Sequence, residues 1–353
     1  AGEFAGSTGT FNNTAACFNV AIGHSAGSNL NASGSYVANR NVYIGRCAGI
    51  AATTSCYNTV VGADAGIGMT GRVAFSNVLL GFCAGRCVTG NRNIAIGQIA
   101  LDRLSPLSSS NIGIGYKAGR SFGDRVTSSN LSIGHLAGDA YYTGCRNTIL
   151  GHYAGRNIEN YCADDLMNDN TIIGSCAAMS MQGQHETFEN VILGYKSALY
   201  ARGLGISTAF SRNVILGSCA GAFMKGSCNI FIGPDAARSP GNFSWWTCGD
   251  SNIGIGQSIQ MPNRFGSNQL AIGQTSQYWI TGDQSFNVGI GSTIPQTKLD
   301  VGGALNVSGV STFGDDVQFR DTVRIGKRHS DEPGVPGRFV IEDGNSFIPT
   351  RMV

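Results

Sequence analysis

Asn111-Ile112-Gly113-Ile114-Gly115-Tyr116-Lys117-Ala118-Gly119 is one copy of a motif that recurs along most of this 353-residue chain. We number every copy from its second glycine, called the anchor, which takes position 0. The fifteen anchors are spaced 16 to 23 residues apart, about 19 on average. A motif repeated at this period predicts a solenoid, in which each repeat stacks on the previous one. The anchors are Gly23, Gly45, Gly62, Gly81, Gly97, Gly115, Gly134, Gly151, Gly174, Gly194, Gly217, Gly233, Gly256, Gly273 and Gly291.

Each copy contains a short apolar segment just before its anchor. Position −1 is Ile, Leu or Val in all fifteen copies, and position −3 is Val, Ile or Leu in twelve and Thr in three. Four or five residues bounded by Asn and Gly are too few for a helix and indicate a strand. We therefore predict an all-β chain: a parallel β-solenoid, or β-roll, of about 15 to 16 rungs with repeats of about 19 residues. A short β-rich C-terminal region is expected to follow.

An asparagine column accompanies the strands at position −4, where only Gln269 departs from Asn. Stacked asparagines can hydrogen-bond to the copies above and below and satisfy the backbone of the corner. The sequence thus predicts a structural ladder along the solenoid. Its members are Asn19, Asn41, Asn58, Asn77, Asn93, Asn111, Asn130, Asn147, Asn170, Asn190, Asn213, Asn229, Asn252 and Asn287.

Alternation along a strand assigns the side chains to two faces. We expect positions −3 and −1 to point into the coil and position −2 to point out. Because most −2 residues are apolar, their face would need cover from neighbouring chains. The interpretation is an intertwined or side-by-side oligomer, most simply a homotrimer. The candidates for packing between chains are Tyr43, Val60, Leu79, Ile149, Ile172, Ile192, Ile215 and Phe231.

The repeats divide the chain into four segments. Residues 1–18 would form an incomplete first rung and a lead-in, because Gly2–Gly6 matches only the later half of the motif. Residues 19–295 form the repeat array, and residues 296–326 a β-rich neck with alternating apolar residues. Residues 327–353 would be a linker with a C-terminal strand segment. The incomplete first rung suggests a fragment of a longer fibre.

Composition excludes several functional classes. A net charge of +2 offers no electrostatic basis for binding nucleic acid. No apolar run approaches the 18 residues that a membrane span needs. Eleven cysteines lie in repeat register, and two pairs, Cys47 with Cys56 and Cys219 with Cys228, are candidate disulfides. The alternative for most cysteines is a buried thiol that serves as a small hydrophobic residue.

Aromatic residues gather near the C-terminal end of the array. Such rings, if exposed, can stack on sugars, so we consider them possible glycan contacts. The alternative is that they cover the solenoid edge or pack between chains. The residues are Phe243, Trp245, Trp246, Tyr278 and Trp279.

Signals for catalysis or cofactor binding are weak. In the Gly-Ile-Gly triplets the third glycine of a dinucleotide site is misplaced, and no helix follows. His135 and His152 lie on successive rungs, but two ligands without carboxylate support make a poor metal site. Acidic residues avoid the strand positions, where a polysaccharide-cleaving solenoid would need paired carboxylates. We therefore expect no catalytic residues, no cofactor and no metal.

The Asn-x-x-Ile-Gly-x-x-Ala-Gly array resembles the left-handed β-roll heads of trimeric autotransporter adhesins, the YadA-like family. It resembles repeat arrays of phage tail fibres more closely. The segment Val288–Phe313 is similar to segments in structural and fibre proteins of marine cyanophages. The resemblance covers residues 19–320 approximately. The long repeat, the many cysteines and the lack of a recognisable tip or membrane-anchor domain depart from it.

This resemblance implies a non-enzymatic, homotrimeric fibre subunit located in a virion tail fibre or on an extracellular surface. Its partners would be copies of itself, other virion or appendage proteins at both ends, and a host-surface glycan, with no membrane and no nucleic acid. Two alternatives stay open at this point. One is a bacterial adhesin of the trimeric autotransporter type, and the other is a fibre-borne polysaccharide depolymerase.

Overall fold

The computed structural model is all-β and contains no helix among the residues that it describes. Those residues form two compact units, Ala1–Gly303 and Ala304–Val353, each described by itself. The described residues are 18–30, 38–69, 74–104, 108–120, 127–140, 144–160, 167–183, 187–201, 210–238, 249–275, 277–309, 311–313, 341–343 and 346–348.

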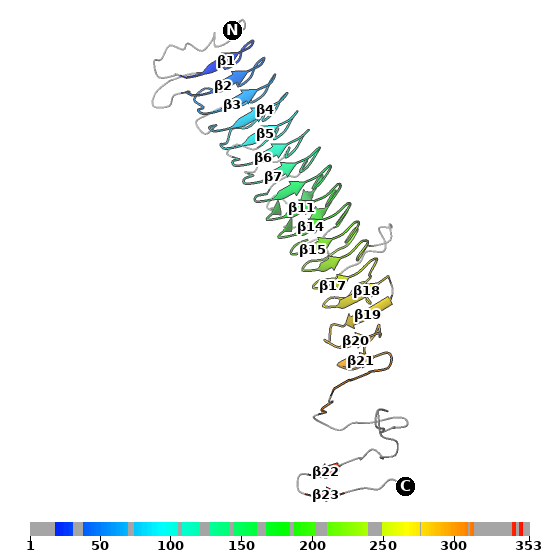
Figure 1. Cartoon of the computed structure of the whole chain (residues 1–353). Helices are drawn as coiled ribbons and strands as arrows, with labels where there is room; N and C mark the ends of the chain where they lie inside the picture. The colour runs from blue at the N-terminus through cyan, green and yellow to red at the C-terminus, as the bar shows by residue number, and fades with distance from the viewer. Residues whose placement is uncertain are drawn as a thin grey trace, which may run out of the picture. The chain divides into compact units, whose positions relative to one another are not determined.

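The first unit is a parallel β-solenoid with one short strand per repeat (Figure 1). Positions −3, −2 and −1 of each strand pair with the same positions of the next, so the repeat register is kept without a shift. Fourteen strands stack in this way. They are β1 (Val20–Ile22), β2 (Val42–Ile44), β3 (Thr59–Val61), β4 (Val78–Leu80), β5 (Ile94–Ile96), β6 (Ile112–Ile114), β7 (Leu131–Ile133), β8 (Thr148–Leu150), β11 (Thr171–Ile173), β14 (Val191–Leu193), β15 (Val214–Leu216), β16 (Ile230–Ile232), β17 (Ile253–Ile255) and β18 (Leu270–Gln274).

Two small sheets accompany the main stack on the loops between rungs. In one, β9 (Glu159–Asn160) pairs with β12 (Gln182–Gly183), and in the other, β10 (Met167–Asn168) pairs with β13 (Thr187–Phe188). Both pairings are parallel, as expected where loops of successive rungs follow the same path. In the second unit, β22 (Ile341–Asp343) and β23 (Ser346–Ile348) form an antiparallel hairpin.

The parallel stack ends earlier than the sequence predicts. After β18 the chain reverses into β19 (Gln277–Gly282), which pairs antiparallel with β18. Next, β20 (Val288–Ile290) pairs antiparallel with β19, and β21 (Leu299–Val301) pairs parallel with β20. The stack therefore has fourteen strands, and the fifteenth repeat is separated from it by β19.

The face assignment of the strands was wrong, because position −2 fills the core of the chain itself. Each rung turns back after its anchor and passes over the −2 side chain, as Gly49 shows by leaving no room for a Cβ beside the Tyr43 ring. Position +3 alanines such as Ala48 and Ala154 line the same core and are fully buried. None of the residues predicted to pack between chains is therefore available to a partner. Tyr43, Val60, Leu79, Ile149, Ile172, Ile192 and Ile215 are 0% exposed and Phe231 is 1% exposed.

Larger side chains fill the space beside two of the glycines at position −2. Where Gly113 occupies this position, the space for a Cβ is filled by Leu101, and where Gly254 occupies it, by Met261 and Phe231. Protein interiors are close-packed, so a missing side chain must be replaced from elsewhere. The buried apolar residues form two clusters, one from Ala26 to Leu104 and the other from Ala137 to Ala271.

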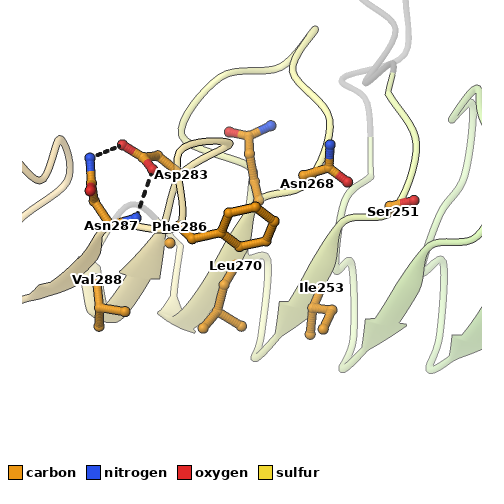
Figure 2. A pocket seen from close by; sticks show the side chains of 10 residues that line it. Ser251, Ile253, Asn268, Leu270, Asp283, Phe286, Asn287 and Val288 are labelled. Atoms are coloured by element: carbon orange, nitrogen blue, oxygen red, sulfur yellow. Dashed lines mark hydrogen bonds between the residues drawn. The ribbon is translucent and has the colours of Figure 1, made fainter. Parts of the chain in front are cut away.

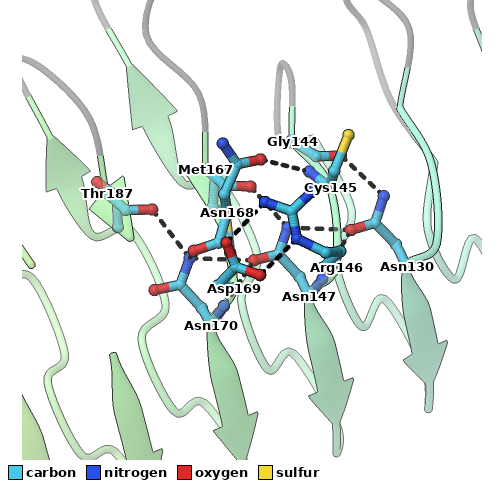
Figure 3. A network of polar contacts seen from close by, with 10 residues as sticks. All are labelled: Asn130, Gly144, Cys145, Arg146, Asn147, Met167, Asn168, Asp169, Asn170 and Thr187. Atoms are coloured by element: carbon cyan, nitrogen blue, oxygen red, sulfur yellow. Dashed lines mark hydrogen bonds and ion pairs between the residues drawn. The ribbon is translucent and has the colours of Figure 1, made fainter. Parts of the chain in front are cut away.

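The predicted asparagine ladder is present from Asn19 to Asn252, and Gln269 extends it. In each step the side-chain Oδ1 accepts a hydrogen bond from the backbone N–H of the ladder residue one rung further on, as between Asn147 and Asn170 at 3.0 Å. The amide nitrogen donates to a loop carbonyl, as from Asn147 to Met167 at 2.7 Å (Figure 3). Every step thus satisfies buried polar groups that the corner would otherwise leave unpaired.

Asn287 was predicted to belong to the ladder and does not. Its backbone N–H and side-chain amide both donate to Asp283, at 2.9 and 3.0 Å, within the turn after β19. Because β19 separates β20 from β18, no ladder residue lies beside Asn287 in the next strand. Gln269 instead donates its backbone N–H to Asn252 Oδ1 at 3.0 Å. The longer glutamine side chain reaches the same acceptor only at 3.5 Å.

Tyr43 makes the stability of the core pH-dependent. Its hydroxyl is buried and lies 3.0 Å from Ser55 Oγ, and burial raises its pKa from 10.0 to about 12. Below pH 10 the phenol is protonated in both the folded and the unfolded chain. Between pH 10 and 12 only the unfolded chain ionises, so the free energy of unfolding falls as the pH rises.

We expect the wild-type chain to lose about 1.4 kcal/mol more of its unfolding free energy than the Tyr43→Phe variant between pH 8 and pH 11. Urea unfolding of both proteins at the two pH values measures the difference. The comparison removes the contribution of other tyrosines and lysines, which titrate equally in both. Equal losses would show that the Tyr43 hydroxyl ionises in the folded state.

Candidate interaction surface

The side chains at positions −3 and −1 point away from the core and form two parallel columns, which we call the outer face. Its residues are half-buried or exposed in all fourteen stacked strands, with Val20, Ile22, Ile133, Val191, Ile232 and Ile253 between 36% and 49% exposed. Of the 28 positions, 25 carry Val, Ile or Leu and only Thr59, Thr148 and Thr171 are polar.

The outer face is a long apolar stripe on the surface of the solenoid. Strands in a sheet lie about 4.8 Å apart, so fourteen of them extend the two columns over roughly 60 Å. Contiguous exposed apolar surface of this kind marks an interaction site. Parallel sheets are generally covered on both faces, and here only the inner face is covered by the chain itself. The outer face is thus the strongest candidate for an interface.

A groove continues the outer face beyond the end of the parallel stack (Figure 2). It has a volume of about 280 Å³, and Ile253, Leu270 and Val288 line it. The pairing of Leu270 with Gly282 and of Gly282 with Val288 explains the hollow, because Gly282 places no side chain between them. Phe286, 79% exposed, lies at the same groove. Sequence reasoning missed it because only the insertion of β19 brings these residues together.

Asp283 holds the turn that carries Phe286. Its carboxylate accepts the backbone N–H groups of Ser285 and Asn287, at 2.8 and 2.9 Å. The hydrogen bond from the backbone of Asn287 is the largest cause that lowers the pKa of Asp283. The aromatic ring at the groove is therefore presented by a turn whose backbone hydrogen bonds are satisfied.

A column of alternating charge runs along one edge of the solenoid at position +5. Five successive repeats carry Arg86, Asp102, Arg120, Asp139 and Arg156 there. Arg86 Nε lies 3.1 Å from Asp102, and Asp102 is the main cause that raises the pKa of Arg86. The Asp139 carboxylate, 3% exposed, receives Arg120 Nε at 2.7 Å and has Arg156 Nε at 3.7 Å. The sequence contains this pattern, but it emerges only when position +5 is aligned across repeats.

The opposite edge carries a column at position −5, directly before the ladder. Its residues adopt left-handed backbone, with φ between +55° and +63°. Arg40 lies between the rings of Phe18 and Tyr57, at 5.6 and 5.3 Å from their centroids. Further along, Arg146 binds Asp169 at 2.6 and 2.8 Å, and the hydrogen bond lowers the pKa of Asp169. Exposed pairs of this kind contribute little to stability.

The candidate disulfides are not formed. Cys47, Cys56, Cys219 and Cys228 are free thiols, as are the other cysteines that the structure describes. Cys47 and Cys219 lie at position +2, after the C-terminal end of a strand, whereas Cys56 and Cys228 lie before the N-terminal end of the next one. The two members of each pair therefore occupy opposite edges of the sheet. The disulfide prediction was wrong because cysteines close in sequence lie at different edges of the sheet.

The predicted glycan contacts are only partly within the described residues. Phe243, Trp245 and Trp246 lie outside them. Tyr278 and Trp279 are neighbours on β19 and so point to opposite faces of that strand. Tyr278 packs against the core, where burial raises its pKa, while Trp279 is 66% exposed. The two rings do not form a joint sugar-stacking platform, and Tyr278 covers the end of the core instead.

Comparison with protein-family models, curated proteins and solved structures gives no match.

Within the described part of the chain, no group of three or more His, Cys, Asp or Glu residues could hold a metal ion. The same residues include no helix long and apolar enough to cross a membrane. The outer face and its groove are therefore the most developed candidate site on the described surface.

Proposed function

We propose that this chain is the subunit of a stiff homotrimeric fibre in a phage tail or a similar extracellular appendage. The outer face is the observation that supports the proposal. Three copies that turn their outer faces toward a common axis would bury about fourteen rows of aliphatic side chains each, and the groove lined by Leu270 and Val288 would extend this contact. Burial of apolar surface drives such association at roughly 25 cal/mol per Å².

Several features favour a mechanical role for this assembly. The strand hydrogen bonds and the asparagine ladder each continue from one rung to the next, so bending would have to strain both. The trimer, rather than a dimer, follows from the resemblance of the repeat to trimeric β-roll heads. Loops at 156–169, 199–212 and 235–251 would be presented to a host-surface glycan, and other appendage proteins would join both ends.

Charges placed on the outer face should separate the chains. Val191 and Val214 pair directly across neighbouring strands. We expect the double variant Val191→Glu, Val214→Glu to sediment as single chains, whereas the wild-type protein sediments with the mass of three. Two carboxylates buried in an apolar seam without partners cost several kcal/mol, which exceeds what one seam segment contributes. Analytical ultracentrifugation at micromolar concentration measures the mass.

Gln257→Glu is the matched control, because this exposed residue lies at position +1, on the edge and not on the outer face. It should leave the mass unchanged. A wild-type protein that sediments as one chain would overturn the proposal. A mass of two chains would retain the buried outer face and contradict the threefold arrangement.

A further inference from the structure

Four aromatic rings form a continuous stack on one edge of the solenoid, away from the outer face. Tyr116, His135 and His152 occupy position +1 of three successive rungs. Tyr116 and His135 stack with ring centroids 5.1 Å apart, as do His135 and His152. Tyr153 meets His152 edge-on at 4.1 Å and His135 at 5.5 Å. We call these four residues the ring stack.

The ring stack presents ring edges to its surroundings. His135 is stacked between Tyr116 and His152, so both of its faces are covered, whereas His152 has one face covered by a stacked ring. Both histidines are nevertheless exposed, and the tyrosines are half-buried. The edges of the two imidazoles carry N–H groups. Such groups donate hydrogen bonds to anionic oxygens.

Cations surround the ring stack, and the nearest carboxylate is already neutralised. Lys117 Nζ lies 5.0 Å from the centroid of the Tyr116 ring, and the Arg156 guanidinium carbon lies 4.9 Å from that of Tyr153. Asp139 is buried between Arg120 and Arg156, at 2.7 and 3.7 Å. Among the described residues that contact the ring stack or Asp139, three cations accompany one carboxylate.

We propose that the ring stack binds an acidic polysaccharide, one that carries carboxylate or sulfate groups along its chain. Successive rungs offer the same type of donor at a repeated spacing of 5.1 Å between ring centroids, which suits a ligand with repeated anionic groups. Single-stranded nucleic acid fits less well, because it is bound by stacking bases on free aromatic faces, and both faces of the central ring, His135, are occupied. The site is distinct from the outer face and does not depend on trimer formation.

The experiment measures binding of the full chain to heparin, polygalacturonate and neutral dextran by isothermal titration calorimetry. The wild-type protein should bind both acidic polymers and should not bind dextran. The double variant His135→Gln, His152→Gln should weaken binding to both acidic polymers at least tenfold. Circular dichroism checks that it retains the wild-type fold.

His24→Gln is the matched control, because His24 occupies position +1 of the first stacked rung and bonds to Ser25 at 3.1 Å, outside the ring stack. It should bind as the wild type does. Unchanged binding by the double variant, equal weakening by His24→Gln, or absence of binding to either acidic polymer would each overturn the proposal. Equally tight binding of single-stranded DNA would also overturn it, since the site would then respond to charge alone.

Discussion

Replacement of Gly151 by alanine should destabilise the solenoid by about 4 kcal/mol or more. Gly151 has φ +134°, which L side chains rarely adopt. An added Cβ would lie 2.5 Å from the Gly174 carbonyl oxygen and 2.8 Å from its carbonyl carbon. Gly174 cannot move away cheaply, because its N–H donates to Leu150 at 2.9 Å. Urea unfolding followed by circular dichroism measures the loss.

Gly303→Ala is the control for this prediction. No heavy atom lies within 4 Å of the position that its Cβ would take, and its φ is not in the left-handed region. We expect a change within about 0.5 kcal/mol. If Gly151→Ala were equally mild, the close approach of successive anchors would not exist in solution.

Replacement of Asn147 by alanine should destabilise the chain by about 3 to 5 kcal/mol. Asn147 is 1% exposed, and its Oδ1 accepts both the backbone N–H and the side-chain amide of Asn170 at 3.0 Å. Its own amide donates to Asn130 at 3.0 Å and to the Met167 carbonyl at 2.7 Å. The variant leaves buried donors and acceptors without partners, each at a cost of about 1 to 3 kcal/mol. Urea unfolding measures the total, and hydrogen exchange of the Asn170 amide locates it.

Two further variants make the ladder prediction specific. Gln274→Ala removes an exposed amide that only contacts exposed Gln257 at 3.3 Å, and should change stability by less than about 0.5 kcal/mol. Asn147→Gln keeps an amide at the ladder, as the chain itself does at Gln269, and should cost less than Asn147→Ala. If the ladder contributed nothing to stability, Asn147→Ala, Asn147→Gln and Gln274→Ala would have the same free energy of unfolding.

The sequence did not determine which face of the strands lies in the core. Positions −1 and −2 are both apolar, so alternation separates two faces without saying which is inside. The regular −1 column suggested a core, yet Ile44 is on the outer face and the variable Tyr43 is inside. Only the path of the chain after the anchor, which brings Gly49 against the Tyr43 ring, decides between them.

The edges of the solenoid give two contrasting cases. Arg86, Asp102 and Arg120 could have been aligned from the sequence, because a fixed repeat position predicts a column. The separation of Cys47 from Cys56 could not be predicted, since the eight residues between them can either return to the same edge or cross to the other. The groove at Leu270 could not be predicted either, because it depends on a change of strand direction that interrupts the repeat.

The sequence by itself determined the repeat, its parallel register and the asparagine ladder, because these depend on local spacing and on identical neighbours stacking in order. Tertiary structure alone decided which face became the core, where the parallel stack ended and which charged and aromatic side chains met at the edges. These features depend on how each rung turns back on itself, and that turn is set by contacts between residues about one repeat apart.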